Sequence, residues 1–262
     1  TVCSGPITSI ILTSSEPGTT YAWTRDNTVN VTGIAASGTG DISGTLTNNT
    51  FVPQTVTFTI TPTVTATGCV GAPITATVTV NAVPTITCPA NITVNNTLGL
   101  CGNTITYTPT FTGIPVPAIT YAFTGATTAS GSGDGSGSFF NVGATTVTIT
   151  ATNSCGFASC TFTVTVNDTE PPIVTTGSIG SCYPSVAAAQ AAALAATSAT
   201  DNCPGVLTEV ASTVGTCSAV VTVTTTDVAG NSTAVTYNTR IDNTAPVITC
   251  PAPVTVSCAS AV

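Results

Sequence analysis

Three segments of the chain run from an alternating valine and threonine stretch into a proline. They span residues 75–84, 161–171 and 235–246, and end at Pro84, Pro171 and Pro246. Alternation of apolar and hydroxyl residues is typical of a half-buried strand, and proline cannot continue a sheet ladder. The prolines recur roughly every 75 to 87 residues, a spacing that fits a small β module repeated in tandem. The sequence therefore predicts an all-β fold, a tandem array of Ig-like β-sandwich domains.

Composition limits what such an array can bind. Only 5% of the 262 residues are charged, the net charge is −8, and Arg25 and Arg240 are the two basic residues. Nearly a quarter of the residues are threonine. No basic patch is available to neutralise phosphates, which argues against nucleic acid and against an anionic membrane surface. No apolar run is long enough to span a membrane, so no membrane insertion is expected.

The eleven cysteines are expected to form disulfides. A thiolate zinc site needs closely spaced cysteines, and the tightest spacings here are Cys155 to Cys160 and Cys250 to Cys258. Disulfides imply an oxidising compartment, either periplasmic or extracellular.

The proline positions divide the chain into three modules and the beginning of a fourth. The predicted domains are residues 1–84, 85–171 and 172–245, followed by 246–262. The last segment repeats the opening pattern of the second module, which predicts the first strand of a truncated fourth domain. An alanine-rich stretch after Pro184 predicts one short helix in the third module, beginning at Pro184 or Ser185. The glycine- and serine-rich segment 130–138 is expected to be a flexible loop.

The first two modules suggest specific disulfides. Cys3 opens the first strand and Cys69 precedes the last strand of module one, positions expected at one pole of a Greek-key sandwich, so a Cys3–Cys69 bridge is predicted. The four cysteines of module two allow three pairings. The favoured combination is Cys88–Cys160 with Cys101–Cys155.

Several sequence motifs resemble those of known repeat families. The first module resembles PKD-like domains of secreted proteins of Bacteroidota, through the segments 18–25, 31–38 and 42–48. The second resembles the HYR (hyalin repeat) domain, through Cys88-Pro, Leu100-Cys-Gly102, Val142–Val147 and Ser159–Val166. The third resembles HYR-related repeats, through Thr200-Asp-Asn-Cys203, Asp227–Asn231 and Tyr237–Pro246. The resemblance implies very long surface adhesins exported by type IX secretion, including gliding adhesins of the SprB type.

The third module departs from these relatives at one position. They often carry a cysteine in the Asp-x-x-Gly-Asn loop, where this chain has Ala229. Cys182 and Cys217 are expected at the same far pole, and their pairing would leave Cys203 unbonded. A Cys182–Cys203 bridge is the competing arrangement.

Acidic residues are concentrated around the third module. In a sandwich, the incoming joint, the second inter-strand loop and the last loop meet at one pole, so Asp168, Asp201 and Asp227 are expected to converge. Oxygen ligands without nitrogen or sulfur suit Ca²⁺, and the acidic joints resemble those of cadherins and calcium-dependent bacterial Ig-like adhesins. The alternative is that these residues are ordinary turn formers. The predicted ligands also include Asn202, Asn231 and Glu170, with Asp242 placed at a second site shared with the next domain.

Catalysis is not expected, because the chain lacks His and Lys and its carboxylates are sparse. The predicted function is structural: a stalk or filament segment of a secreted, outer-membrane-attached adhesin, serving gliding motility or surface attachment. Its expected partners are neighbouring repeats, the motility and secretion machinery implied by the resemblance, and an extracellular glycan or protein. A carbohydrate- or protein-binding module and a self-assembling fibre are the alternatives. The first joint, residues 81–84, contains no acid and must rely on packing or stay flexible.

Overall fold

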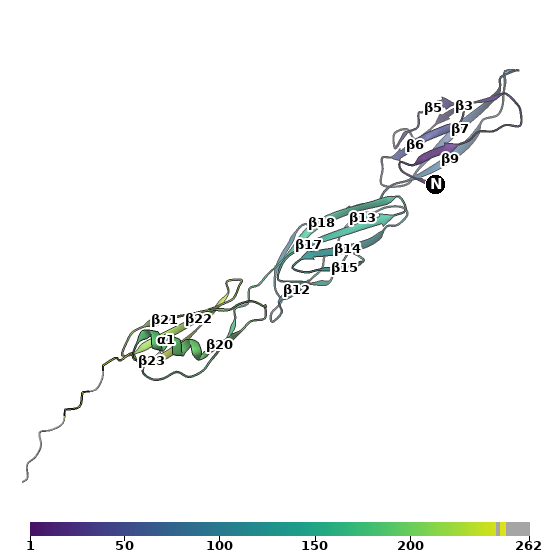
Figure 1. The fold of residues 1–262 in the computed structure, drawn as a ribbon. Helices are drawn as coiled ribbons and strands as arrows, with labels where there is room; N and C mark the ends of the chain where they lie inside the picture. Colours follow the sequence, from purple (N-terminus) through teal and green to yellow (C-terminus); the bar gives the residue numbers. More distant parts are fainter. Residues whose placement is uncertain (245–246, 250–262) are drawn as a thin grey trace, which may run out of the picture. The chain divides into compact units, whose positions relative to one another are not determined.

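The computed structural model describes residues 1–244 and 247–249 (Figure 1). The chain divides into two compact units. The first unit is Thr1–Asp168, and the second begins at Thr169. Three hydrophobic cores lie along the chain, two in the first unit and one in the second. The predicted fourth domain, 246–262, lies outside the described residues except for 247–249, which form no strand.

The first sandwich packs two sheets around one core. The larger sheet has the order β1-β9-β7-β3-β5, with β8 added to β7, and the smaller has the order β2-β6-β4. The strands are β1 (Val2–Cys3), β2 (Ile7–Ile10), β3 (Thr19–Arg25), β4 (Val31–Gly33), β5 (Ser37–Thr39), β6 (Ile42–Asn48), β7 (Gln54–Val64), β8 (Cys69–Val70) and β9 (Ile74–Asn81).

Alternation along β7 and β9 explains why these strands form. Thr59 of β7 lies opposite Thr75 of β9, and both are exposed. Phe58 and Ile60, on the other face of β7, are fully buried. The ring of Trp23 meets Phe58 edge-on at a centroid distance of 5.8 Å, so Trp23 is a core residue.

The second sandwich repeats the order of the larger sheet. Its five strands run β11-β18-β17-β14-β15, and the pairs β10–β13 and β12–β16 complete it. The strands are β10 (Thr85–Thr87), β11 (Ile92–Asn95), β12 (Gly102–Ile105), β13 (Thr110–Thr112), β14 (Ala118–Gly125), β15 (Ala129–Ser132), β16 (Ser138–Asn141), β17 (Gly143–Asn153) and β18 (Gly156–Asn167).

The glycine- and serine-rich segment 130–138 is not the simple loop that the sequence predicts. Its first part belongs to β15, which pairs with β14, and Ser138 begins β16. Tyr107 holds the turn between them, because its hydroxyl donates to Asp134 O at 2.9 Å and its N–H donates to Ser136 Oγ at 2.8 Å. The segment therefore forms part of two sheets.

The third sandwich combines a three-stranded sheet, β21-β22-β23, with an antiparallel pair, β19–β20, and a helix that lies between these two strands in sequence. The elements are β19 (Ile173–Thr176), α1 (Val186–Ala195), β20 (Thr197–Thr200), β21 (Thr208–Val214), β22 (Ala219–Thr226) and β23 (Ser232–Thr239).

The predicted helix is confirmed as α1. Ser185 is its N-cap, and Ser185 Oγ accepts the N–H of Ala188 at 3.2 Å. Ala189 and Ala193 are fully buried in the core of the sandwich. The small alanine side chains allow the helix to lie close to the sheet.

Candidate functional site: a disulfide-linked joint

A disulfide joins the first two sandwiches. Cys3, the last residue of β1, is bonded to Cys155 in the turn between β17 and β18, with the two Cα atoms 5.0 Å apart. The bond encloses the proline joint at Pro84. The chain therefore crosses this joint once through its backbone and once through two sulfur atoms.

The predicted Cys3–Cys69 bridge is wrong. Cys3 lies opposite Asn81 at one end of the larger sheet, where Gln54 begins β7. Cys69 lies opposite Val64 at the other end of β7. The length of an eleven-residue strand separates the two cysteines, on the order of 30 Å, far beyond the reach of a disulfide.

The second sandwich contains the predicted Cys88–Cys160 disulfide, with Cα atoms 5.7 Å apart. The predicted Cys101–Cys155 bridge is wrong. Cys101 O accepts the N–H of Val142, next to the first residue of β17, whereas Cys155 follows the last residue of that strand. The two cysteines thus lie at opposite ends of β17. Cys101 is also disulfide-bonded.

Packing supports the disulfide at the joint. Asn153 Nδ2 donates to Ala82 O at 3.5 Å and to Pro115 O at 3.2 Å. A Cβ atom added to Gly113 would lie 3.2 Å from Pro84 Cα, and one added to Gly156 would lie 3.1 Å from Val83 Cγ1. The second sandwich therefore approaches the joint through glycine backbone and an asparagine amide.

Asn48 organises the first sandwich beside the joint. Its amide Nδ2 donates to Val80 O at 2.9 Å and to Val52 O at 2.8 Å, and its Oδ1 accepts the N–H and the hydroxyl of Thr50. Its own N–H donates to Ser4 Oγ at 3.0 Å. This buried side chain ties β6 to the last strand and to the segment that follows Cys3.

The predicted Cys182–Cys217 bridge is wrong. The segment 240–242 runs between the two cysteines: Arg240 N donates to Ser181 O, and Ile241 N donates to Thr216 O. Two segments on either side of a strand are roughly 10 Å apart, and a disulfide requires Cα atoms within about 7 Å. Within residues 1–244 and 247–249, both thiols are exposed and unbonded. Cys250 and Cys258 lie outside the described residues.

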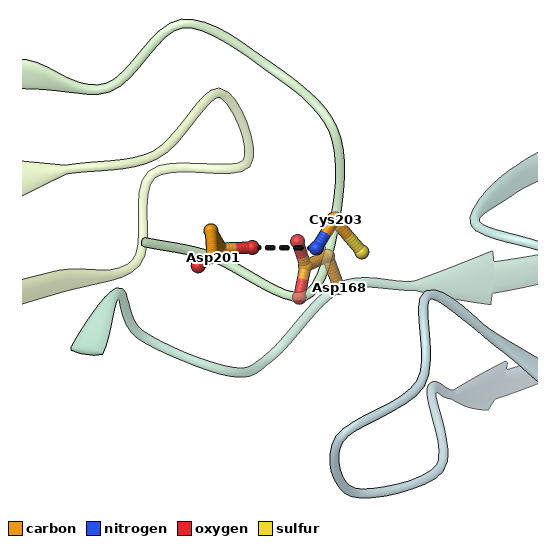
Figure 2. A group of neighbouring side chains, drawn as sticks. All are labelled: Asp168, Asp201 and Cys203. Carbon is orange, nitrogen blue, oxygen red and sulfur yellow. Dashed lines mark hydrogen bonds between the residues drawn. The ribbon is translucent and has the colours of Figure 1, made fainter. Parts of the chain in front are cut away.

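Cys203 is disulfide-bonded, so the expectation that it is left unbonded is also wrong. It lies in the loop after β20, where its N–H donates to Asp201 Oδ1 at 2.8 Å. Figure 2 draws this pair with Asp168, the residue at which the first unit ends. These three residues are of types that can bind a metal ion, but a disulfide sulfur is not a thiolate ligand. The candidate metal ligands of this loop are therefore oxygen atoms.

Two polar atoms of this loop are unusual. Asp201 Oδ2 and Asn202 Nδ2 are buried and have no hydrogen-bond partner among the residues that the structure describes. A buried carboxylate oxygen without a partner is costly. An ion or a donor at this position would remove that cost.

Asp227 and Asn231 bind each other. Asp227 Oδ1 accepts the N–H of Asn231 at 2.8 Å, and Asp227 Oδ2 accepts its amide Nδ2 at 2.9 Å. Burial raises the pKa of Asp227, but the hydrogen bonds from Asn231 and from the backbone of Gly230 and Ala229 outweigh it and lower the pKa. The pair closes the turn between β22 and β23.

The remaining predicted ligands lie at the ends of the second unit. Glu170 is half-buried near its start. Asp242 is exposed, and its Oδ1 accepts the N–H of Thr244 at 2.9 Å. That bond is an ordinary Asx-turn.

A surface hollow of about 480 Å³ lies on the first sandwich and is lined by residues 19–22, 39, 40 and 63. Four of these are threonines, while Trp23 beside it is only 8% exposed. The hollow therefore offers hydroxyls and the half-buried ring of Tyr21.

No helix in the described part of the chain is long and apolar enough to cross a membrane. No curated protein matches the sequence.

Several solved structures of consecutive domains are similar to this chain. The titin fragment I67–I69 is 10% identical, with a TM-score of 0.42, and the match covers 92% of this chain and 94% of that one. The extracellular domains 3–5 of Drosophila OTK are 12% identical, with a TM-score of 0.30 and coverage of 92% and 93%. The Ig1 and Ig2 domains of DIP-gamma are 13% identical, with a TM-score of 0.36 and coverage of 63% and 92%.

One family model matches the chain. It covers residues 1–84, which correspond to the first sandwich, and describes the PKD-like domain.

Proposed function

We propose that the chain is a tension-bearing spacer of a long secreted adhesin. Tandem Ig-like sandwiches with disulfides are consistent with an extracellular structural or adhesion module. The observation that carries the proposal is the Cys3–Cys155 bond, because it links successive sandwiches covalently.

The bond changes the path of a force applied to the two ends of the chain. Force that enters at Thr1 reaches Cys3 after two residues and passes through the disulfide to Cys155. Residues 4–154, which include all of β2 to β17, lie in a closed covalent loop outside this path. The first sandwich therefore keeps its fold while tension passes it.

Single-molecule pulling tests this load path. The fully oxidised chain is compared with the C3S/C155S variant, in which the Cys88–Cys160 bond remains. In the variant, residues 4–87 enter the load path and 155–159 leave it, so the fully extended chain should be longer by about 80 residues, or ~280 Å. Equal extended lengths for the two proteins would contradict the proposal.

The proposal also covers the repeat family of each sandwich and the class of the parent protein. Its support is the PKD-like match over residues 1–84 and the HYR-type motifs around Cys88 and Cys203. We assign the second and third sandwiches to HYR-type repeats, and the parent protein to type IX-secreted, outer-membrane-attached adhesins that serve gliding or attachment. Antibody labelling of intact cells, with and without that secretion system, tests the assignment. Labelling that persists without the system would exclude it.

Calcium binding at the acidic loop is proposed as a second source of stiffness. Asp201 supports it, because its buried Oδ2 lacks a hydrogen-bond partner among the described residues. Asn202 supplies an amide beside it. Asp168, Glu170 and Asp242 enter as ligands on sequence grounds alone. Asp227 and Asn231, already bonded to each other, would contribute only their remaining lone pairs.

Thermal unfolding tests calcium directly. At a calcium concentration one hundred times Kd, binding stabilises the folded state by about 2.7 kcal/mol. The unfolding transition of the third sandwich should rise on adding calcium and fall with EGTA, and D201N should remove the difference. An unchanged transition in the wild-type chain would exclude the site.

A further inference from the structure

The two sandwiches of the first unit have the same sheet topology. The strand order β1-β9-β7-β3-β5 corresponds to β11-β18-β17-β14-β15, strand by strand. In both sheets the first strand is parallel to the last: β1 pairs with β9, and β11 pairs with β18. Positions in one sandwich can therefore be compared directly with positions in the other.

Cys69 and Cys155 occupy equivalent places in this topology. Cys155 lies in the turn between β17 and β18, and Cys69 is the first residue of the short strand β8, within the connection between β7 and β9. Each cysteine N–H meets a side-chain oxygen two residues earlier, Asn153 Oδ1 at 2.8 Å and Thr67 Oγ1 at 3.4 Å. Cys155 uses this position to bind Cys3, at the end of the first strand of the preceding sandwich.

The thiol of Cys69 has the exposure that an equivalent bond requires. It is exposed and unbonded within the part of the chain that the structure describes. Its apolar neighbours are exposed as well, Val70 at 67% and Ile74 at 58%. Phe157 of β18, two residues after Cys155, is likewise 71% exposed.

We propose that Cys69 is the receiving cysteine of a second inter-domain disulfide. Its partner is an Ig-like module that precedes residue 1 in the same polypeptide and carries a cysteine at the end of its first strand, as Cys3 does here. Together with Cys3–Cys155, the bond would link successive sandwiches covalently at equivalent positions. The proposal rests on the covalent linkage of sandwiches in the proposed function, but its test reads bond formation and not mechanics, so either can fail alone.

The chemistry is thiol–disulfide exchange. The Cys69 thiolate attacks a low-molecular-weight disulfide such as oxidised glutathione, which forms a mixed disulfide and releases one reduced glutathione. The thiolate of the partner cysteine then attacks the Cys69 sulfur and releases the second glutathione. The two protein thiols lose two protons and two electrons, which reduce one oxidised glutathione to two thiols.

The test places a second copy of residues 1–84, which contain both sheets and the core of the first sandwich, ahead of the full chain. A T1S substitution in the added copy changes the mass of its Cys3 peptide and so distinguishes it from the resident Cys3 peptide. The added copy carries C69S, and the resident chain carries C182S, C217S, C250S and C258S, so alkylation of Cys69 reports on the resident copy alone. After oxidation by glutathione, non-reducing peptide mapping should link the added Cys3 to the resident Cys69, with about tenfold less alkylation of Cys69 than in the unfused chain.

The control variant C69S in the resident chain should lose this linked peptide and keep the resident Cys3–Cys155 pair. A resident Cys69 that stays fully alkylated while Cys3–Cys155 forms would overturn the proposal. A concentration-dependent covalent dimer of the unfused chain through Cys69 would also overturn it, by identifying a second copy as the partner.

Discussion

Cys3 and Cys155 are 152 residues apart in sequence, belong to different β-sandwiches, and are joined by a disulfide. The first proline joint, which contains no acid, is thus held by a covalent bond and by packing against Val83 and Pro84.

Removal of the inter-sandwich bond should destabilise the first unit. Closing a loop of this length restricts the unfolded chain, so C3S/C155S should lower the free energy of unfolding by about 5 kcal/mol. Chemical denaturation of oxidised protein measures the effect. C69S is the control, and a similar loss in that variant would show that cysteine replacement itself is the cause.

Replacing Asn48 should lower the stability of the first sandwich far more than replacing its neighbour Asn49. N48A leaves the buried Val80 carbonyl without this donor and removes the acceptor of Thr50, so it should cost about 2 kcal/mol of stability. N49A removes one exposed bond to Thr32 Oγ1 of 3.4 Å and should be nearly neutral. Equal unfolding midpoints for the two variants would contradict the role given to Asn48.

The helix α1 of the third sandwich should accept a larger side chain on its exposed side but not on its buried side. Ala193 is fully buried against the sheet, so A193L should overpack the core and cost about 2 kcal/mol. Ala191 is exposed on the same helix, and A191L should leave the thermal transition unchanged. Equal shifts for both variants would contradict the packing of α1.

Asp227 should make the third sandwich sensitive to acid. Its pKa is lowered in the folded state, so its stabilising contribution is present above the unfolded pKa of about 3.9 and is lost as the pH falls through the folded value. D227N should flatten the decline of unfolding free energy below about pH 4. E16Q removes the same charge from the first sandwich and serves as the control. A decline in D227N as steep as in the wild type would contradict this assignment.

The long strands could be predicted from sequence because alternation of threonine with valine, isoleucine or phenylalanine fixes both faces at once. Segments 56–61 and 160–166 fall within β7 and β18. Strands of two or three residues, such as β1, β5 and β8, are too short to show a period. Their pairing depends on the longer strands beside them.

The disulfides were harder to predict for a physical reason. Cys88–Cys160 lies within one sandwich, where strand order limits the choices. The prediction of Cys3–Cys69 depends on the two cysteines sharing one pole of the first sandwich, but they lie at opposite ends of β7. Cys155 lies instead at the pole where the second sandwich meets the first joint. No spacing in the sequence distinguishes a bond within a module from one between modules.

The acidic loop could be predicted only in part. The sequence identified Asp201, Asn202 and Asp227 as candidates, but not that Asp227 and Asn231 bind each other or that Asp201 keeps one buried oxygen unpartnered among the described residues. Which of these polar atoms are paired depends on the directions of the side chains in the loop after β20 and in the turn between β22 and β23.

Non-reducing peptide mapping of the oxidised chain tests the central claim most directly. Peptic digestion followed by mass spectrometry should recover a peptide pair that links Cys3 to Cys155, which disappears on reduction, together with the Cys88–Cys160 pair. Cys69 should be recovered alkylated. A peptide pair linking Cys3 to Cys69 would confine the bond to the first sandwich and contradict the covalent joint.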